Sequence, residues 1–439
     1  TTHAEHAEML ETCERLIAAA QEQLFMPDSE SLVLLNTLSY DANTAVELPA
    51  DWAGAGLVDE AGEKVAVQTD GNGAAVAMVS VPSLGICKLR KSGKATASTT
   101  DQELVLENAL VRYEFAGNGE LTAAIDKETG ASILAEGERG NILSLYIDRP
   151  NNWDAWDVDV FYEDELLQTA EGVSAKVLGK GAVQGSLAFT LKVGDSTIQQ
   201  TVRLAANSKR LDFKTEVDWQ ERHKMLRAAF PVNVRSDFAS FDIQYGYAKR
   251  PTHRNTSWDM ARFEVAAHKY IDLSDLDYGV ALLNDCKYGH KVHDNVLDLN
   301  LLRAPTYPDA DADLGKHSFT YSLLPHKGDL VASDVMAEAS LLNQPVSVFA
   351  GSSIRAVSAL PVQVESDSVQ LEVLKKAEKE DCLVIRLVER AGRKGSATLA
   401  VAGELIETDL MEWHDAGAVG KGKVELSFEP FEIRTFKIK

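Results

Sequence analysis

The sequence is poor in cysteine and has no long apolar run. Its four cysteines lie far apart in the chain, at Cys13, Cys87, Cys286 and Cys382. They form no CxxC pair, which argues against a disulfide framework and against a structural zinc site. No apolar run approaches the roughly 20 residues of a membrane-spanning helix, and residues 1–10 do not read as a secretory signal. We therefore predict a cytoplasmic protein with no membrane partner.

Positive charge is also scarce. Against 67 Asp and Glu residues the chain has 44 Lys and Arg, which gives a formal net charge of −23. A surface with this excess of negative charge repels phosphate groups. The composition therefore argues against nucleic acid and against anionic membrane as partners.

Several catalytic motifs are missing. The sequence contains no GxSxG, no P-loop, no HExxH and no GxGxxG motif. Nothing resembles repeated βαβ units, so neither a Rossmann domain nor a TIM barrel is expected in this chain. Carboxylates are plentiful, but their spacing does not single out a glycosidase pair, whose two groups lie roughly 5 Å apart in a retaining enzyme.

The chain opens with a helical pattern and continues with strand patterns. Residues 2–24 carry an apolar stripe at steps of three and four residues, as an amphipathic helix does. A single helix cannot bury such a stripe by itself. Short alternating runs follow to the end of the chain, and the clearest lies at 210–219. We predict a mainly β protein with a helix in 1–27, a small β domain and linker in 28–100, a large antiparallel β unit in 101–345 and a terminal β sandwich in 346–439.

The most informative segment is Asn151–Asp159, which holds two indoles and three carboxylates in nine residues. Amphipathic aromatic faces suit the apolar faces of sugar rings, and carboxylates accept hydrogen bonds from hydroxyls. The same composition fits a tight turn with two core tryptophans and solvated acids. Local composition leaves both interpretations open.

Further candidates lie where polar loops follow apolar strands. Arg303 at a strand end fits either a bidentate clamp on a carboxylate or a surface ion pair. The loop with His253, Asn255 and Trp258 suits a ligand contact or a well-bonded loop between strands. Asp285 follows an apolar strand in the same manner.

Histidine spacing does not define a metal site. His290 and His293 have the spacing of ligands on one helix face, but their flanks predict a strand and no third ligand is marked. His3 and His6 lie at the start of the predicted helix and are expected to be solvated. The residues alone therefore identify no metal ligand in this chain.

Five long segments together resemble a known enzyme family. They are Gly140–Asp159, Arg222–Val232, Arg250–Leu273, Tyr278–Gly289 and Leu299–Gly328. In this order they are similar to the carboxy-terminal half of glycoside hydrolase family 38 α-mannosidases, in the cytosolic, broad-specificity branch. The resemblance implies that the first helix ends a helical middle domain and that the large unit is a supersandwich of the galactose-mutarotase-like kind.

The resemblance also implies a retaining exo-α-mannosidase that acts on terminal α-mannosides of oligosaccharides. In that family a divalent metal, usually zinc, binds sugar hydroxyls, an Asp attacks the anomeric carbon and a second carboxylic acid protonates the leaving oxygen. The family's Asp nucleophile and metal ligands, including a His-Asp pair, have no counterpart here. We therefore expect a missing N-terminal catalytic domain of the same protein, with no catalytic residue and no bound metal in this fragment.

The expected role of the chain is to wall and support the mannose site. The residues predicted to do so are Trp153, Asp154, Trp156, Asp157 and Arg303, with His253, Asn255, Trp258 and Asp285 as further loop candidates. A stand-alone carbohydrate-binding or assembly module without hydrolytic activity stays open as an alternative, as does an epimerase on the mutarotase-like fold. The stripe of helix 2–24 is expected to be covered by the missing domain or by another copy of the chain.

Overall fold

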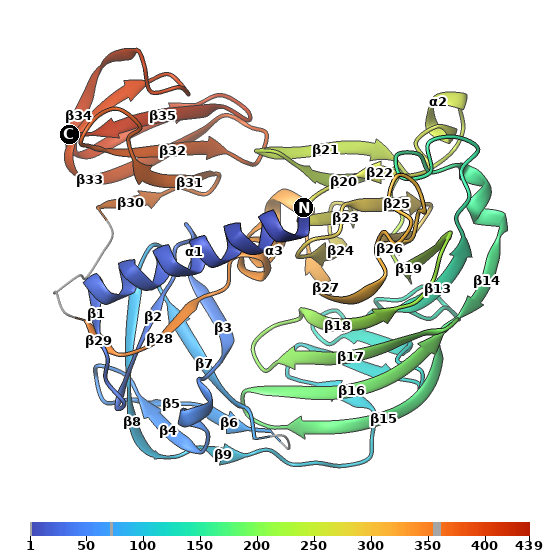
Figure 1. The fold of residues 1–439 in the computed structure, drawn as a ribbon. Coiled ribbons are helices and arrows are strands. Elements are labelled where there is room, and N and C mark those ends of the chain that lie inside the picture. Colours follow the sequence, from blue (N-terminus) through green and yellow to red (C-terminus); the bar gives the residue numbers. More distant parts are fainter. Residues whose placement is uncertain (1, 71–72, 354–360) are drawn as a thin grey trace.

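The computed structural model describes residues 2–70, 73–353 and 361–439. A long helix, α1 (Thr2–Leu24), crosses one face of a molecule built almost entirely from strands (Figure 1). This confirms the prediction of a mainly β protein with a short N-terminal helical part. None of the helices among the described residues is long and apolar enough to cross a membrane.

Two sheets near the N-terminus share one hydrophobic cluster, in which Trp52 on η1 (Ala50–Trp52) is fully buried. The five-stranded sheet has the order β28 (Ser347–Ala350), β2 (Ser31–Leu35), β8 (Ile86–Lys94), β4 (Ala55–Val58) and β5 (Lys64–Val65). The four-stranded sheet has the order β3 (Ala42–Glu47), β7 (Ala75–Val81), β6 (Val67–Thr69) and β9 (Thr96–Ala97). The later strand β28 completes the edge beside β2, so the N-terminal sheets include residues beyond 345. The division of the chain into domains stays a prediction.

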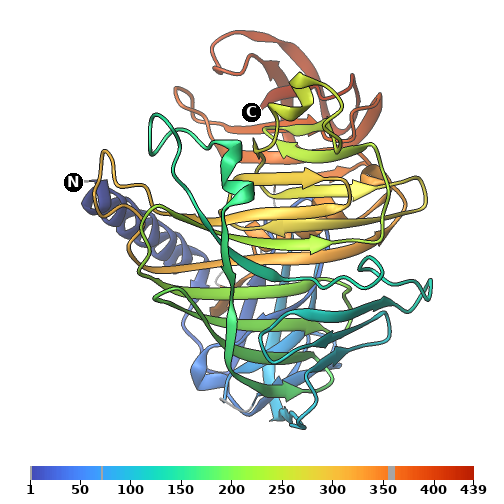
Figure 2. The ribbon, with the colours of Figure 1, turned by 90° about the vertical axis from the view of Figure 1, so that its right-hand side faces the viewer.

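The middle of the chain forms two large sheets and one small sheet around a common hydrophobic core. The nine-stranded sheet has the order β15 (Glu171–Lys180), β16 (Gln184–Val193), β17 (Ser196–Ala205), β18 (Leu211–Trp219), β27 (Gly315–Lys327), β24 (Tyr278–Asn284), β23 (Tyr270–Ser274), β20 (Phe238–Ile243) and β21 (Gly246–Pro251). The six-stranded sheet has the order β14 (Leu166–Thr169), β13 (Ile142–Ile147), β19 (Lys224–Pro231), β26 (Val296–Arg303), β25 (Gly289–His293) and β22 (Val265–Ala266). The small sheet consists of β10 (Val105–Glu107), β11 (Val111–Phe115) and β12 (Leu121–Asp126). We call this part the large sandwich, and Figure 2 shows it from the right-hand side of the view in Figure 1.

Strand β18 illustrates why these residues form a sandwich. Its side chains alternate between buried and exposed along the whole strand, from Leu211 to Trp219. Because successive side chains of a strand point to opposite faces, this alternation places one apolar face in the core and one polar face in solvent. The preceding hairpin turns at Gly194, which has a φ of +56°, a backbone conformation that glycine adopts without steric cost.

The terminal part contains a third antiparallel unit. Its strands have the order β30 (Val362–Glu365), β33 (Gly395–Thr408), β35 (Ile433–Ile438), β32 (Leu383–Glu389) and β31 (Val369–Lys376), and β34 (Asp415–Phe428) pairs with β33. We call this unit the terminal sheet. The remaining elements are β1 (Phe25–Met26), which pairs with β29 (Ser352–Ser353), the helices α2 (Ser257–Met260) and α3 (Val335–Asn343), and the 3₁₀ turns η2 (Val160–Asp164) and η3 (Leu330–Ala332).

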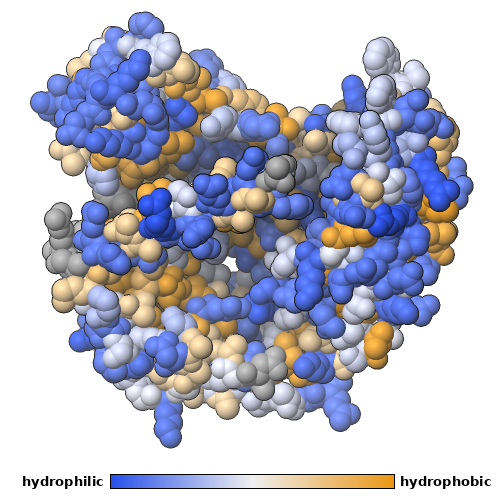
Figure 3. All heavy atoms as spheres, viewed as in Figure 1, coloured by the Kyte–Doolittle hydropathy of each residue, from blue (hydrophilic) through white to orange (hydrophobic). Residues whose placement is uncertain are grey.

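Helix α1 is hardly covered by the rest of the described chain. None of its residues is buried, and Leu10 and Ile17 of the predicted stripe are 65% and 55% exposed. In the space-filling view the face that α1 crosses is hollowed at its centre (Figure 3). The cover that we expected for this stripe, either another domain or a second copy, stays a prediction.

Candidate functional site

The segment between β13 and β14 leaves the large sandwich and presents two tryptophans to solvent. Trp153 and Trp156 are 68% and 65% exposed, whereas Trp52 and Trp219 are completely buried. The indoles of Asn151–Asp159 are therefore not core side chains, and the interpretation as a turn with two core tryptophans is wrong. Trp153 has a φ of +57°, a conformation that is uncommon for residues other than glycine.

Arg303 fastens this segment to the end of β26. Its Nε donates to the Asp148 carboxylate at 2.5 Å, and Asp148 is only 3% exposed. Its Nη2 donates to the backbone carbonyls of Asp154 and Asp157 at 3.2 and 2.8 Å. In the described structure the guanidinium holds the Asp148 carboxylate through Nε alone, so it forms neither the predicted bidentate clamp nor a surface ion pair. Arg303 instead fixes the base and the backbone of this loop.

Asp154 fastens the same segment to the loop after β26. Its Oδ2 accepts hydrogen bonds from the backbone N–H groups of Thr306 and Tyr307 at 2.7 and 3.2 Å, and from the Thr306 hydroxyl at 3.3 Å. His223 lies 3.5 Å from the other oxygen. The Asp154 carboxylate is therefore largely occupied by its own chain. It acts as a brace here, and a contact between Asp154 and a sugar stays a prediction.

Asp157 differs from Asp154, although only two residues separate them. Its backbone N–H donates to the carbonyl of Trp153, and its backbone carbonyl accepts from Arg303. Its side chain is exposed and has no hydrogen-bond partner in the described part of the chain. Beside the two indoles, this free carboxylate is available to accept hydrogen bonds from a ligand.

A second loop brings another exposed indole to the same end of the large sandwich. Arg254 forms two hydrogen bonds of 2.7 and 2.6 Å with Glu163 on η2, and Figure 1 shows α2 beside this segment at the upper right. Thr256 and Asp259 form a capping box that starts α2, and Trp258 on this helix is 76% exposed. We call the segments 151–164 and 252–260 the aromatic loops.

The other predicted loop residues have modest roles in the described structure. The Nδ1 of His253 accepts a hydrogen bond from the backbone N–H of Asn255 at 3.4 Å and lies 3.7 Å from Asp259. The Asp285 carboxylate accepts a hydrogen bond from the Thr320 backbone N–H at 2.8 Å. The structure therefore brings His253 and Asn255 to the α2 loop and binds Asp285 to β27.

A buried charge network lies under the aromatic loops, and none of the residues predicted from the sequence to form the site belongs to it. Arg227 is 1% exposed and contacts Asp298 at 2.8 Å and Glu264 at 3.0 Å. Lys291 bridges Asp298 and Glu163 at 3.4 and 3.2 Å. Burial raises the pKa of Glu264, and Arg227 opposes this shift. The sequence does contain a signal for part of this network, because Arg227 and Asp298 each interrupt an apolar strand.

The histidine pair does not form a metal site in the described structure. Successive residues of a strand point to opposite faces, so His290 and His293 on β25 diverge. Burial lowers the pKa of His290 to about 3, which keeps this ring neutral. Among the described residues there is no group of three or more His, Cys, Asp or Glu side chains arranged to hold a metal ion.

Two family models match the chain. The first, described as the glycosyl hydrolases family 38 C-terminal domain, matches residues 106–311. The second, described as the glycosyl hydrolases family 38 C-terminal beta sandwich domain, matches residues 368–436. The first match contains the aromatic loops, and the second lies within the terminal sheet.

Curated relatives match nearly the whole chain but extend well beyond it. Alpha-mannosidase 2C1 of Homo sapiens is 36% identical over 429 residues, which cover 93% of this chain and 39% of that protein. Alpha-mannosidase G of Dictyostelium discoideum is 30% identical over 446 residues, and this match covers 93% of this chain and 40% of that protein. The chain thus spans about two fifths of the length of these relatives.

A solved structure supports the fold. The crystal structure of an alpha-mannosidase from Enterococcus faecalis V583 aligns with a TM-score of 0.70 and covers 94% of this chain and 56% of that chain. At 17% sequence identity, this likeness shows a shared fold and carries no assignment of individual residues.

Proposed function

Because the chain belongs to glycosyl hydrolase family 38, whose C-terminal domains it carries, we propose that it is the C-terminal part of an α-mannosidase. In this proposal a preceding region supplies the nucleophile and the metal ligands of a retaining exo-α-mannosidase, which removes terminal α-mannose from oligosaccharides. The relatives named Alpha-mannosidase support the activity, and their greater length supports the preceding region. A cytoplasmic location, which the unpaired cysteines favour, belongs to the proposal.

The observation that carries the proposal is a pair of exposed indoles on a braced loop. Exposing Trp153 and Trp156 forgoes the free energy that burying large aromatic side chains supplies. Arg303 and Asp154 nevertheless fix the backbone that presents them. A rigid aromatic surface of this kind suits the apolar face of a mannose ring, while the free Asp157 carboxylate suits its hydroxyls. The loop therefore walls the sugar site.

The braces would act on the reaction through geometry. Arg303 and Asp154 hold the aromatic loop at a fixed position relative to the large sandwich, and accurate positioning of a substrate is worth orders of magnitude in rate. We assign both residues a positioning role. The metal of the proposed reaction, zinc in our expectation, finds no fitting ligand set among the described residues, so no step through it is assigned to this chain.

The test compares the present chain with the longer protein that also contains the preceding region. Both are assayed for hydrolysis of an aryl α-mannoside, with zinc and after chelation. We expect metal-dependent turnover by the longer protein and none by residues 1–439. Robust turnover by the 439-residue chain would contradict the division of labour, and inactivity of the longer protein would contradict the assigned reaction.

A stand-alone carbohydrate-binding module is the second candidate. The observation in its favour is that Trp153, Trp156 and Trp258 are all presented by loops of this chain itself. Titration of mannose into the isolated chain distinguishes the two functions at the aromatic loops. Millimolar or tighter binding that Trp153→Ala abolishes would favour the module.

A further inference from the structure

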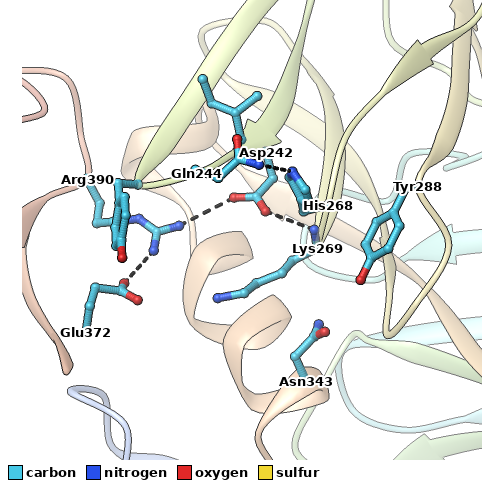
Figure 4. A pocket seen from close by; sticks show the side chains of 10 residues that line it. Asp242, Gln244, His268, Lys269, Tyr288, Asn343, Glu372 and Arg390 are labelled. Atoms are coloured by element: carbon cyan, nitrogen blue, oxygen red, sulfur yellow. Dashed lines mark hydrogen bonds and ion pairs between the residues drawn. The ribbon is translucent and has the colours of Figure 1, made fainter. Parts of the chain in front are cut away.

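A polar pocket of about 300 Å³ lies where the large sandwich, α3 and the terminal sheet meet. Figure 4 shows side chains from all three parts pointing into one space. The large sandwich contributes Asp242, His268 and Lys269, and the terminal sheet contributes Glu372 and Arg390. Its volume is at the lower end of the roughly 300–1,000 Å³ found for small-molecule sites.

Arg390 lies at the boundary of the two sheets and is only 4% exposed. It donates to Glu372 at 2.5 Å and to Asp242 at 3.4 Å, so one guanidinium joins the terminal sheet to β20. Its Nε is buried and has no hydrogen-bond partner among the described residues. A buried arginine with a free N–H group and one long hydrogen bond is incompletely satisfied.

Lys269 supplies a second cation with a free end. Its backbone N–H donates to Asp242 at 2.9 Å. Its ammonium forms no ion pair within the described chain, and it reaches into the space between Glu372 and Asn343 (Figure 4). An ammonium offers three hydrogen-bond donors, and all of these are available to a ligand in the pocket.

The rim is aromatic. Tyr288 is 55% exposed, and its ring lies 5.2 Å from the ring of His268. His268 is held in turn by a contact of 3.0 Å between its Nε2 and the amide nitrogen of Gln244. A phenol of this kind offers an apolar face together with a hydroxyl that donates and accepts.

The charges in the pocket favour a neutral ligand. Two cations, Arg390 and Lys269, are balanced by two carboxylates, Asp242 and Glu372. An anion would add uncompensated charge to this set, and the net charge of −23 would slow its approach. Hydroxyl groups both donate and accept, which matches a lining that offers ammonium, carboxylate, amide and phenol groups.

The pocket is separate from the aromatic loops. It lies at the turn between β20 and β21, and the loop with Trp258 begins at the other end of β21. Six residues of strand span about 20 Å at ~3.4 Å per residue. None of the residues that line the pocket belongs to the aromatic loops, so a ligand here is not the one that those loops would contact.

We propose that this pocket binds one neutral sugar ring, and that the bound sugar joins the large sandwich to the terminal sheet. The ligand donates hydroxyl hydrogens to Asp242 and Glu372, accepts from Lys269, and covers Tyr288 with its apolar face. Only the choice of mannose as the sugar rests on the proposed function, because the pocket chemistry itself requires no more than a hexose-sized polyol.

The test is a titration of methyl α-mannoside into the 439-residue chain. Binding is measured by calorimetry and by NMR spectra of the chain with ¹⁵N-labelled histidine. We expect saturable binding that shifts the His268 resonances. Lys269→Met should raise the dissociation constant at least tenfold. The control is Lys214→Met on β18, which removes an exposed ammonium outside the pocket and should leave the dissociation constant unchanged. The Tm of each variant verifies that the fold is kept.

Further outcomes separate this proposal from the others. Binding that Lys269→Met and Tyr288→Ala leave unchanged, or no binding at all, would overturn it. Binding of inorganic phosphate without binding of the mannoside would overturn the neutral ligand class. Trp153→Ala should leave binding at this pocket intact, so binding lost with Trp153→Ala would place the sugar at the aromatic loops. Failure of the mannosidase assay in the longer protein would leave this titration unaffected.

Discussion

Two parts of the molecule expose large apolar side chains, and they do so in opposite ways. The loop Asn151–Asp159 exposes Trp153 and Trp156 on a backbone fixed by Arg303 and Asp154. Helix α1 exposes its apolar stripe with no buried residue of its own. Contacts within the described chain therefore fix the conformation of the aromatic loop, whereas no part of the described chain buries the stripe of α1. Exposed apolar surfaces mark contacts with ligands or with other proteins. We propose that the braced loop contacts a ligand and that the stripe of α1 contacts another domain or a second copy.

The largest effect is expected when Arg227, the buried cation beneath the aromatic loops, is replaced. Arg227→Met keeps a side chain of similar size but leaves Glu264 buried without its cation and leaves Asp298 with only Lys291, 3.4 Å away. Loss of one partner of a buried ion pair costs about 3–5 kcal/mol of unfolding free energy. Denaturant unfolding measures this loss. The control Arg203→Met breaks an ion pair with Glu47 whose partners are 31% and 57% exposed, and should cost no more than about 1 kcal/mol. Equal losses in both variants would contradict the network.

The second test uses two acids of the same loop. Asp154→Ala removes the acceptor for the N–H groups of Thr306 and Tyr307, and we expect a loss of about 2 kcal/mol, since hydrogen bonds to charged groups contribute ~1.5–3 kcal/mol each. Asp157→Ala is the matched control and should change stability by less than about 0.5 kcal/mol. Hydrogen exchange at residues 303–310 should speed up only in Asp154→Ala. The same acceleration in both variants would remove Asp154 from the brace.

The third test uses pH. Burial alone would raise the pKa of Glu163, but its bonds to Arg254 and Lys291 outweigh burial and lower it. A lowered carboxyl pKa stabilises the folded state above the ordinary pKa of glutamate, near 4.3, and this contribution disappears as the pH falls through the folded-state value. We expect proteolysis of the aromatic loops to accelerate below about pH 4. Glu163→Gln should be susceptible at neutral pH already, and an unchanged pH profile in that variant would contradict the assignment.

The smallest effect is expected for α1. Leu10 and Ile17 are mostly exposed, so Leu10→Ser with Ile17→Ser should change the unfolding free energy of this chain by less than about 0.5 kcal/mol. If a second copy covers the stripe, sedimentation will show a dimer that the double variant dissociates. A large loss of stability in a monomeric chain would contradict the comparison of the two surfaces.

Local sequence patterns predicted much of the fold because they record which face of an element is buried. The alternation in 210–219 and the stripe in 2–24 both correspond to observed elements, β18 and α1. The resemblance of five segments predicted the family, and the matches at 106–311 and 368–436 confirm it.

Details of the candidate site depend on contacts between distant residues, which local patterns do not contain. Arg227 and Asp298 are 71 positions apart and meet through the pairing of β19 with β26. Asp242 and Arg390 are separated by 148 positions. Composition likewise could not show whether the indoles of Asn151–Asp159 were core or surface, because the same residues serve either purpose.

The most direct test of the central claim is the kcat/KM of the longer protein for an aryl α-mannoside after Trp153→Ala with Trp156→Ala. The control is Trp413→Ala, which removes an indole that is 55% exposed on the terminal part of the chain. If the braced aromatic loop walls the mannose site, the double variant loses at least tenfold in kcat/KM while it keeps its Tm, and the control retains full activity. Wild-type kcat/KM in the double variant would contradict the account.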